Sequence, residues 1–169
     1  MLRVKRLAIV TGRGAAPPEV KAAEMLRDRI RKRSAVRVAI EQEGPGTQAN
    51  PRAELVLVVG SPEGNDMARD LMEKLGARLP TLPNSDRRHR EGFAVASGIV
   101  EGRPHVIIAG ADPRGTIYGV GWFLRAITYL PECIKVPKLD VQDKPAFWLR
   151  GGNPSGPGSR ARQYGKLRP

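Results

Sequence analysis

A strand followed directly by a helix, residues 105–127 (HVIIAGADPRGTIYGVGWFLRAI), constrains the fold of this chain more than any other stretch. The run VIIA is apolar and largely β-branched on both faces, which is typical of a central strand covered on both sides. Gly110 ends the strand, the carboxylate of Asp112 can cap the next element, and Pro113 suits a first helical position. We therefore predict a buried central strand and a helix that begins at Pro113.

The predicted helix has one apolar stripe and two glycines. The stripe consists of Ile117, Val120, Leu124 and Ile127, with Phe123 beside them. Gly115 and Gly119 leave one face thin enough for another backbone to approach closely. We expect this helix to lie flat against the sheet.

The chain before this stretch alternates strands with helices. We predict strands over residues 6–11, 36–40 and 55–59. The first predicted helix enters at Pro17 and Pro18, with an apolar stripe of Val20, Ala23, Leu26 and Ile30 and with Met25 on its flank. The second has Asn65 as its N-cap and Gly76 as its C-terminal stop, and it turns Ala68, Leu71, Met72 and Leu75 inward.

Residues 91–97 (EGFAVAS) form the next predicted strand, and the connection 98–104 joins it to the central strand as an antiparallel hairpin. We therefore expect a mixed β-sheet with about three packed helices in a single α/β (α+β) domain over residues 1–143. We predict an irregular chain after Ile127. Residues 144–169 are interpreted as a linker, the truncated start of a further strand and a disordered basic tail rich in Gly, Pro, Ser and Arg.

Charge and cysteine content limit the functional classes. The chain has 29 Lys and Arg residues against 17 Asp and Glu, which gives a net charge of +12. Because these charges are scattered, we expect a solvated surface and no nucleic-acid binding, although a free-standing basic module that binds nucleic acid or another polyanion stays the alternative. Cys133 has no partner for an intramolecular disulfide. Apolar runs are too short for a signal peptide or a membrane span, so we expect a cytoplasmic protein as written, or a secreted or periplasmic one if a leader is missing.

No constellation in the sequence describes a self-sufficient enzyme. The segment GADPRGT (residues 110–116) has the spacing of a phosphate loop but lacks its lysine, and Asp112 would compete with a bound phosphate. A small phosphate-handling enzyme is a third hypothesis on this segment alone. His89 and His105 lack neighbours at metal-ligand spacing, and no G-x-S-x-G turn or pair of strand-end carboxylates is present. We expect no catalytic residue, cofactor or metal.

The segments EGFAV, HVIIAG and ADPRGTIYGVGWFLRAI together resemble the α/β domain that precedes the catalytic barrel in family 20 β-N-acetylhexosaminidases and family 67 α-glucuronidases. The pattern D-x-R-G-x-x-Y-G-x-x-x-L of these families is matched by Asp112, Arg114, Gly115, Tyr118, Gly119 and, one place early, Phe123 with Leu124. The resemblance covers residues 5–151. It implies a fold like the second domain of the hexosaminidases.

The continuation KPAFWLRGG (residues 144–152) is similar to the first barrel strand, P-x-F-x-x-R-G, of those families. By this resemblance, Arg150 would bind sugar hydroxyls in a complete enzyme. The sequence departs from the family after this point, because no Asp follows the Arg-Gly pair closely. The resemblance implies a non-catalytic N-terminal domain whose partner is the catalytic barrel of a glycoside hydrolase, with carbohydrate bound only through that barrel.

Overall fold

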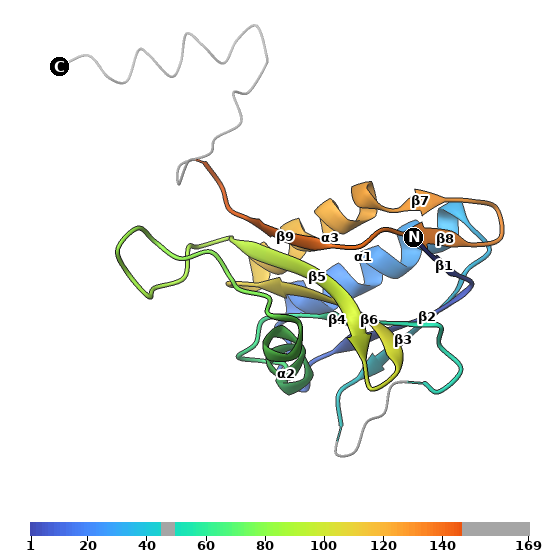
Figure 1. The fold of residues 1–169 in the computed structure, drawn as a ribbon, viewed down its shortest axis with the longest axis horizontal. Helices are drawn as coiled ribbons and strands as arrows, with labels where there is room; N and C mark the ends of the chain where they lie inside the picture. The colour runs from blue at the N-terminus through green and yellow to red at the C-terminus, as the bar shows by residue number, and fades with distance from the viewer. Residues whose placement is uncertain (45–49, 147–169) are drawn as a thin grey trace, which may run out of the picture.

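A mixed six-stranded sheet forms the centre of the protein, for which the computed structural model describes residues 1–44 and 50–146 (Figure 1). Its strands lie in the order β3 (Arg37–Gln42), β2 (Arg6–Thr11), β4 (Leu55–Val59), β6 (Arg103–Gly110), β5 (Phe93–Val100) and β9 (Asp140–Asp143). The first four run parallel, and β5 is antiparallel to both β6 and β9. The predicted mixed sheet is confirmed, with β4 and β6 at its centre.

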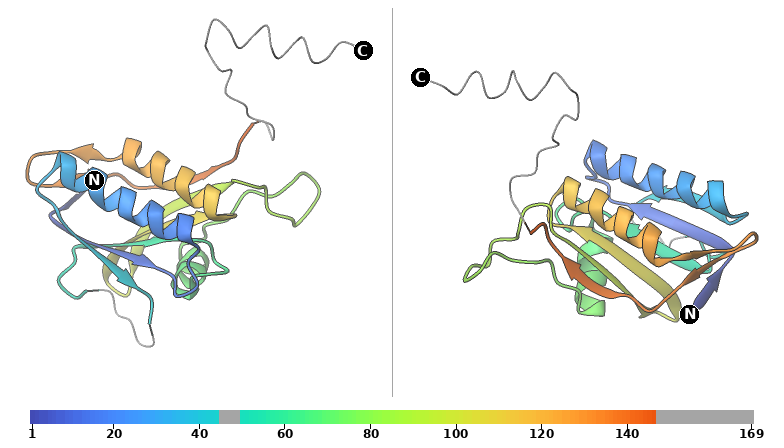
Figure 2. Two further views of the ribbon diagram at one scale, coloured as in Figure 1. Left: turned by 180° about the vertical axis from the view of Figure 1, so that it is seen from behind. Right: turned by 90° about the horizontal axis from the view of Figure 1, so that it is seen from above.

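In residues 1–44 and 50–146, three helices cover the two faces of this sheet. The helices α1 (Pro17–Arg33) and α3 (Pro113–Ala126) lie side by side on one face, and α2 (Asp66–Leu75) lies on the other (Figure 2). Each face therefore has its own apolar core. Ile9, Leu57 and Ile108 point toward α1 and α3, whereas Val58 and Ile107 point toward α2. None of the helices in the described ranges has the length and apolarity that crossing a membrane requires.

The local signals at the helix ends are confirmed. The Asn65 Oδ1 atom accepts a hydrogen bond from the backbone N–H of Ala68 at 2.9 Å, and Gly76 ends α2 with a left-handed φ of 67°. The helix α3 begins at Pro113 with Asp112 as its N-cap. These helix ends could be predicted from the sequence because capping depends on residues within one helical turn.

The prediction of an irregular chain after Ile127 was wrong. This region contains β7 (Thr128–Tyr129), β8 (Ile134–Val136) and β9. A second, three-stranded sheet has the order β1 (Leu2–Val4), β8, β7, while β9 pairs with β5. These strands have only two to four residues, too few to show a hydrophobic period, and their hydrogen-bond partners come from distant parts of the chain.

Two further details differ from the prediction. The hairpin between β5 and β6 turns on only two residues, Glu101 (φ 51°) and Gly102 (φ 76°), so the strands continue through most of the predicted 98–104 connection. In α1, Val20 is 41% exposed, while the neighbouring Glu19 is buried at 1% exposure. A helical stripe read from apolar residues alone misses a carboxylate whose hydrogen bonds are satisfied inside the protein.

The apolar stripe of α3 is centred differently from the prediction. Thr116, Gly119, Val120 and Phe123 are buried in the described structure, whereas Ile117 and Leu124 are only partly buried. The buried face therefore runs through the small residues, which bring the helix close to the sheet.

The single cysteine, Cys133, is buried and has a free thiol.

Candidate functional site

The carboxyl ends of β2 and β4 form the point at which an α/β sheet of this kind usually binds a ligand. The chain leaves β2 for α1 on one face and leaves β4 for α2 on the other, which opens a crevice between the two loops. Here the loops fill it themselves. The backbone N–H of Gly14 donates to the carbonyl of Gly64 at 3.1 Å, and a Cβ atom on Gly12 would lie 1.9 Å from that same oxygen. The crevice is closed by backbone contact.

The carboxylate of Glu19 lies buried beside this closed crevice. Its Oε1 atom accepts hydrogen bonds from the backbone N–H of Ser61 at 2.6 Å and from the Thr116 hydroxyl at 3.3 Å. Its Oε2 atom accepts from the backbone N–H of Ala16 at 2.8 Å. Glu19 thus joins α1, the loop after β4 and α3. Glu19 was not among the residues predicted to be functional, although a Glu at the third helical position is a known capping signal.

The residues that carry the family resemblance meet at a second place, where α3 begins beside the loop that precedes β5. The Asp112 carboxylate caps α3 through the backbone N–H of Gly115 at 2.8 Å, and its other oxygen accepts from the backbone N–H of Glu91, also at 2.8 Å. The backbone N–H of Ala111 donates to the carbonyl of Gly92 at 2.8 Å. We call this contact region, formed by residues 91–93 and 111–119, the motif junction.

The motif junction decides the phosphate-loop hypothesis for residues 110–116. A phosphate loop needs free backbone donors at the helix N-terminus. Here the Asp112 carboxylate occupies the Gly115 donor and places a negative charge where the phosphate would lie. Pro113 supplies no N–H at all. The Gly115 donor of this segment therefore binds the Asp112 carboxylate in place of a phosphate.

Two glycines of α3 allow the close packing in the motif junction. A Cβ atom on Gly115 would lie 2.2 Å from the carbonyl oxygen of Gly92, and one on Gly119 would lie 2.8 Å from Cγ2 of Ile108. The helix therefore rests directly on β5, β6 and the loop before β5. Arg114 and Tyr118, in contrast to the two glycines, lie on the outer surface of α3. There the Arg114 guanidinium forms an ion pair with Glu91 at 3.2 Å.

A groove of about 540 Å3 lies outside the motif junction, lined by Pro18, His89, Arg90, Glu91, Asp112, Pro113, Arg114 and Pro145. A neighbouring groove of about 380 Å3 contains Tyr118, Arg125 and Lys144. Both adjoin the end of β9. Arg150, the residue expected to bind sugar, lies outside the described residues.

Neither histidine lies in a metal site in the described part of the chain, where no group of three potential metal ligands occurs. The Nδ1 atom of His105 lies 2.9 Å from the carbonyl oxygen of Arg103, and burial lowers the pKa of this imidazole. His89 contacts the carbonyl of Arg90 in the same way at 2.8 Å.

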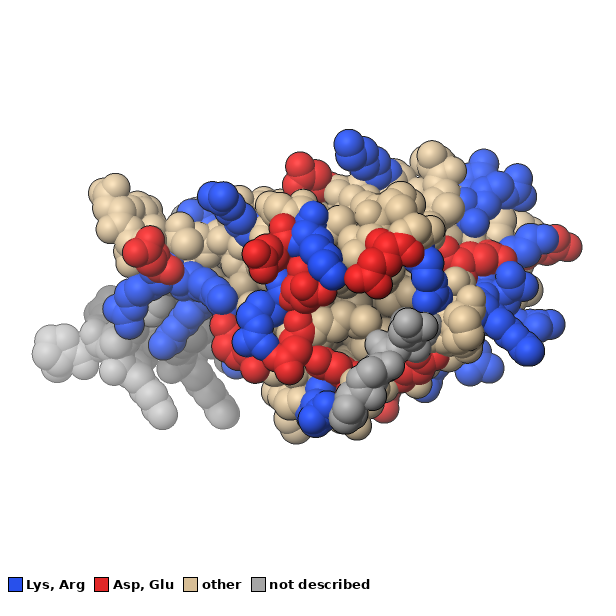
Figure 3. All heavy atoms as spheres, turned by 60° about the horizontal axis from the view of Figure 1, so that its bottom comes forward, with Lys and Arg blue, Asp and Glu red and all other residues tan. Residues whose placement is uncertain are grey.

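On the face turned forward in Figure 3, basic and acidic side chains are interspersed, so this face has no patch of a single charge sign.

No protein-family model and no curated protein matches the sequence. Among solved structures, CpGH84B is similar with a TM-score of 0.52 at 15% identity, over 92% of this chain and 23% of that chain. Two further structures are more distant. CpGH84D has a TM-score of 0.40 at 13% identity, over 69% of this chain and 16% of that chain. A GH138 enzyme targeting pectin rhamnogalacturonan II has a TM-score of 0.39 at 12% identity, over 71% of this chain and 13% of that chain. These structural neighbours are glycoside hydrolases. The similarity to CpGH84B concerns the fold, and this chain spans about a quarter of that protein's length.

Proposed function

We propose that this chain is a non-catalytic α/β domain of a glycoside hydrolase, in which it packs against and supports a catalytic barrel. The observation that carries the proposal is the similarity of nearly the whole chain to 23% of CpGH84B. The matched pattern of the motif junction favours a parent enzyme of the family 20 hexosaminidase or family 67 α-glucuronidase type. In that enzyme the barrel is the partner, and carbohydrate is bound through it, with Arg150 contributing at the first barrel strand.

The hydrogen bonds of the buried and groove-lining carboxylates support a role without catalysis. Glycoside hydrolysis needs two carboxyl groups that are free to exchange a proton with the substrate and to attack it or activate water. In the larger groove, both oxygens of Asp112 accept backbone N–H groups, and Glu91 is paired with Arg114. The Glu19 oxygens are also occupied, and that side chain is buried. Glu19 and Asp112 therefore link segments of the fold, and Glu91 is neutralised by an ion pair.

The genomic DNA immediately downstream of this coding sequence tests the proposal. We expect a reading frame there, in any of the three phases, that encodes a (β/α)8 barrel. An unrelated gene there, in a genome that encodes no barrel able to partner this domain, would contradict the proposed supporting role.

The chain as it stands should not hydrolyse nitrophenyl N-acetylglucosaminide or nitrophenyl glucuronide, because the carboxylates of the groove are held by other groups. The measurement is release of nitrophenol against a heat-inactivated control. Turnover that is lost in Glu91→Gln or Asp112→Asn, but kept in the surface variant Glu63→Gln, would show that the groove is an active site and that the domain is catalytic.

A further inference from the structure

The strand β3 forms an open edge of the main sheet. It pairs only with β2 in the described structure. The backbone N–H groups of Arg37 and Glu43 donate to carbonyl oxygens of Lys5 and Thr11, at 2.9 Å and 2.8 Å. Because backbone groups alternate in direction along a strand, residues 37, 39, 41 and 43 face β2, and Val38, Ile40 and Gln42 direct their N–H and C=O groups outward. The outward groups form a template for a further strand.

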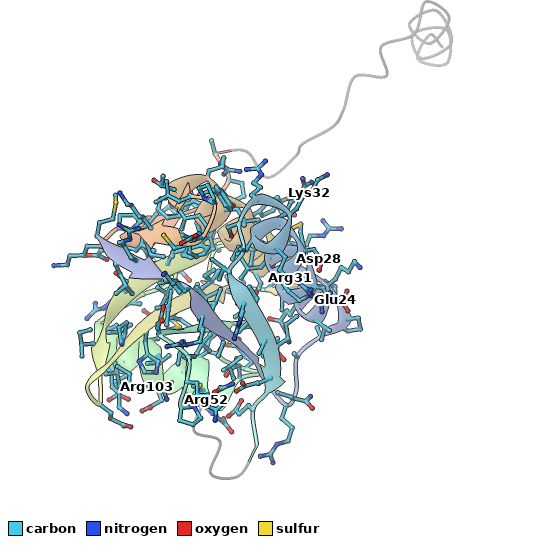
Figure 4. All side chains as sticks on the ribbon, turned by 90° about the vertical axis from the view of Figure 1, so that its right-hand side faces the viewer. Glu24, Asp28, Arg31, Lys32, Arg52 and Arg103 are labelled. Atoms are coloured by element: carbon cyan, nitrogen blue, oxygen red, sulfur yellow. The ribbon has the colours of Figure 1, made fainter. Side chains whose placement is uncertain are left out.

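Basic side chains flank this edge on both faces of the sheet. Figure 4 shows Arg31 and Lys32 on the side of α1, where Glu24 and Asp28 also lie. It shows Arg52 and Arg103 on the opposite side. A groove of about 430 Å3 on the first side contains Arg31 and Arg37. A groove of about 250 Å3 on the second contains Arg6, Arg37 and Arg52. The positive charge is therefore concentrated beside the first half of β3.

Not all of the guanidinium groups beside the edge are neutralised by a carboxylate in the described part of the chain. Arg6 is paired with Glu54 at 3.0 Å. Arg37 and Arg52, in contrast, have no carboxylate within 4.0 Å among residues 1–44 and 50–146. Their charges are available to a ligand that lies along the edge.

The second half of β3 has a different character. Ile40 is only partly buried against the core, so apolar surface remains exposed at this end of the strand. The carboxylates of Glu41 and Glu43 lie at this end, where they accept backbone N–H groups of Asn50 at 3.1 Å and of Asp66 at 3.0 Å. An acidic ligand group would be repelled here, so complementarity to the edge changes along its length.

We propose that the β3 edge binds an extended peptide segment of another protein, which adds to the sheet as a further strand. The segment carries acidic residues opposite residues 37–39 and β-branched residues opposite 40–42. Main-chain hydrogen bonds to Val38, Ile40 and Gln42 supply affinity, and the arginines on the two faces select the alternating side chains of the segment. This inference does not depend on the proposed function.

Nucleic acid and a second copy of the chain fit the edge less well. Neither groove beside β3 contains an aromatic side chain on which a base could stack. A second copy could offer its acidic β9 edge, with Asp140 and Asp143. That contact is heterologous and would repeat from copy to copy, into a closed ring or an open filament. Each of these two occupants predicts a binding result different from that of a peptide.

The test measures binding of a fluorescein-labelled peptide, EEDVTVTV, to the full chain by fluorescence anisotropy. Two isomers of this peptide carry N-methyl groups on alternate backbone nitrogens of the VTVTV part, with the same charge. If the peptide adds as a strand, the isomer methylated on the side facing β3 should bind at least about tenfold more weakly, because two or more hydrogen bonds are lost. Equal affinity of the two isomers would overturn the proposal.

Variants of the protein test the same contact from the other side. Arg37→Gln together with Arg52→Gln should weaken binding by about threefold to tenfold, the range expected of exposed ion pairs. The matched control Arg114→Gln removes an exposed arginine of α3 and should leave affinity unchanged. Gln42→Pro removes one outward N–H without breaking the pairing with β2 and should weaken binding while circular dichroism shows a folded protein.

Two other results would also overturn the proposal. Tighter binding of a 20-base-pair DNA duplex than of the peptide, lost as salt is raised, would assign the edge to a polyanion. Concentration-dependent self-association in sedimentation, abolished by Gln42→Pro, would assign it to a second copy of this chain. The peptide KKKVTVTV, with the opposite charge, should not bind measurably if the arginines act as proposed.

Discussion

Gly115→Ala should lower the free energy of unfolding by about 3 kcal/mol, although alanine is the better helix former. A Cβ atom on Gly115 would lie 2.2 Å from the carbonyl oxygen of Gly92, which is a backbone atom. The loop has no room to move away, because a Cβ on Gly92 would already meet Pro80 at 2.4 Å and the Gly92 carbonyl accepts the Ala111 N–H. Urea denaturation followed by circular dichroism measures the change.

The control is Gly121→Ala in the same helix. A Cβ atom on Gly121 would lie 3.7 Å from Nη1 of the Arg125 side chain, which is an ordinary van der Waals contact. This variant should be more stable than the wild type by about 0.5–1 kcal/mol, the usual difference between alanine and glycine within a helix. If both substitutions stabilise the protein, α3 does not press on the loop before β5 and our description of the motif junction is wrong.

Glu19→Ala should cost about 4 kcal/mol of stability, because it leaves the buried N–H of Ser61 and the N–H of Ala16 without an acceptor. Total stabilities of single domains are about 5–15 kcal/mol, so this variant should melt far below the wild type. Glu19→Gln keeps one carbonyl oxygen and should lose about half as much. Thermal melting and urea titration measure both changes.

Glu24→Ala provides the matched control on the same helix. The Glu24 carboxylate forms a surface ion pair with Lys21 at 2.9 Å, and such pairs contribute at most about 1 kcal/mol. An equal loss of stability in Glu19→Ala and Glu24→Ala would show that Glu19 does not link α1, α3 and the loop after β4.

Much of the architecture could be predicted because its signals are local. The continuous, β-branched apolar runs of β4 and β6 are typical of strands covered on both faces, and they were placed correctly. Asn65, Gly76, Asp112 and Pro113 mark helix ends through bonds within a single turn. The pattern from Asp112 to Gly119 implied a domain fold found in glycoside hydrolases, and the similarity to CpGH84B agrees with it at the level of the fold.

The candidate site needed the tertiary structure, since its contacts join residues far apart in the chain. Glu19 meets Thr116 across 97 positions, and Asp112 meets Glu91 across 21. No periodicity in the sequence encodes such pairs. The same reason explains the strands missed after Ile127, whose partners are β1 and β5, and the closure of the crevice between Gly14 and Gly64.

The sequence by itself therefore determined the three described helices with their ends and the longer strands, through hydrophobic period and capping chemistry. Only the tertiary structure decided which polar groups are satisfied inside the protein and which remain at its surface. Glu19 and Asp112 are carboxylates whose oxygens are taken by backbone N–H groups, whereas Arg37 and Arg52 face an open strand edge. A residue's chemistry depends on its hydrogen-bond partners and burial, and in this fold those are set by segments distant in sequence.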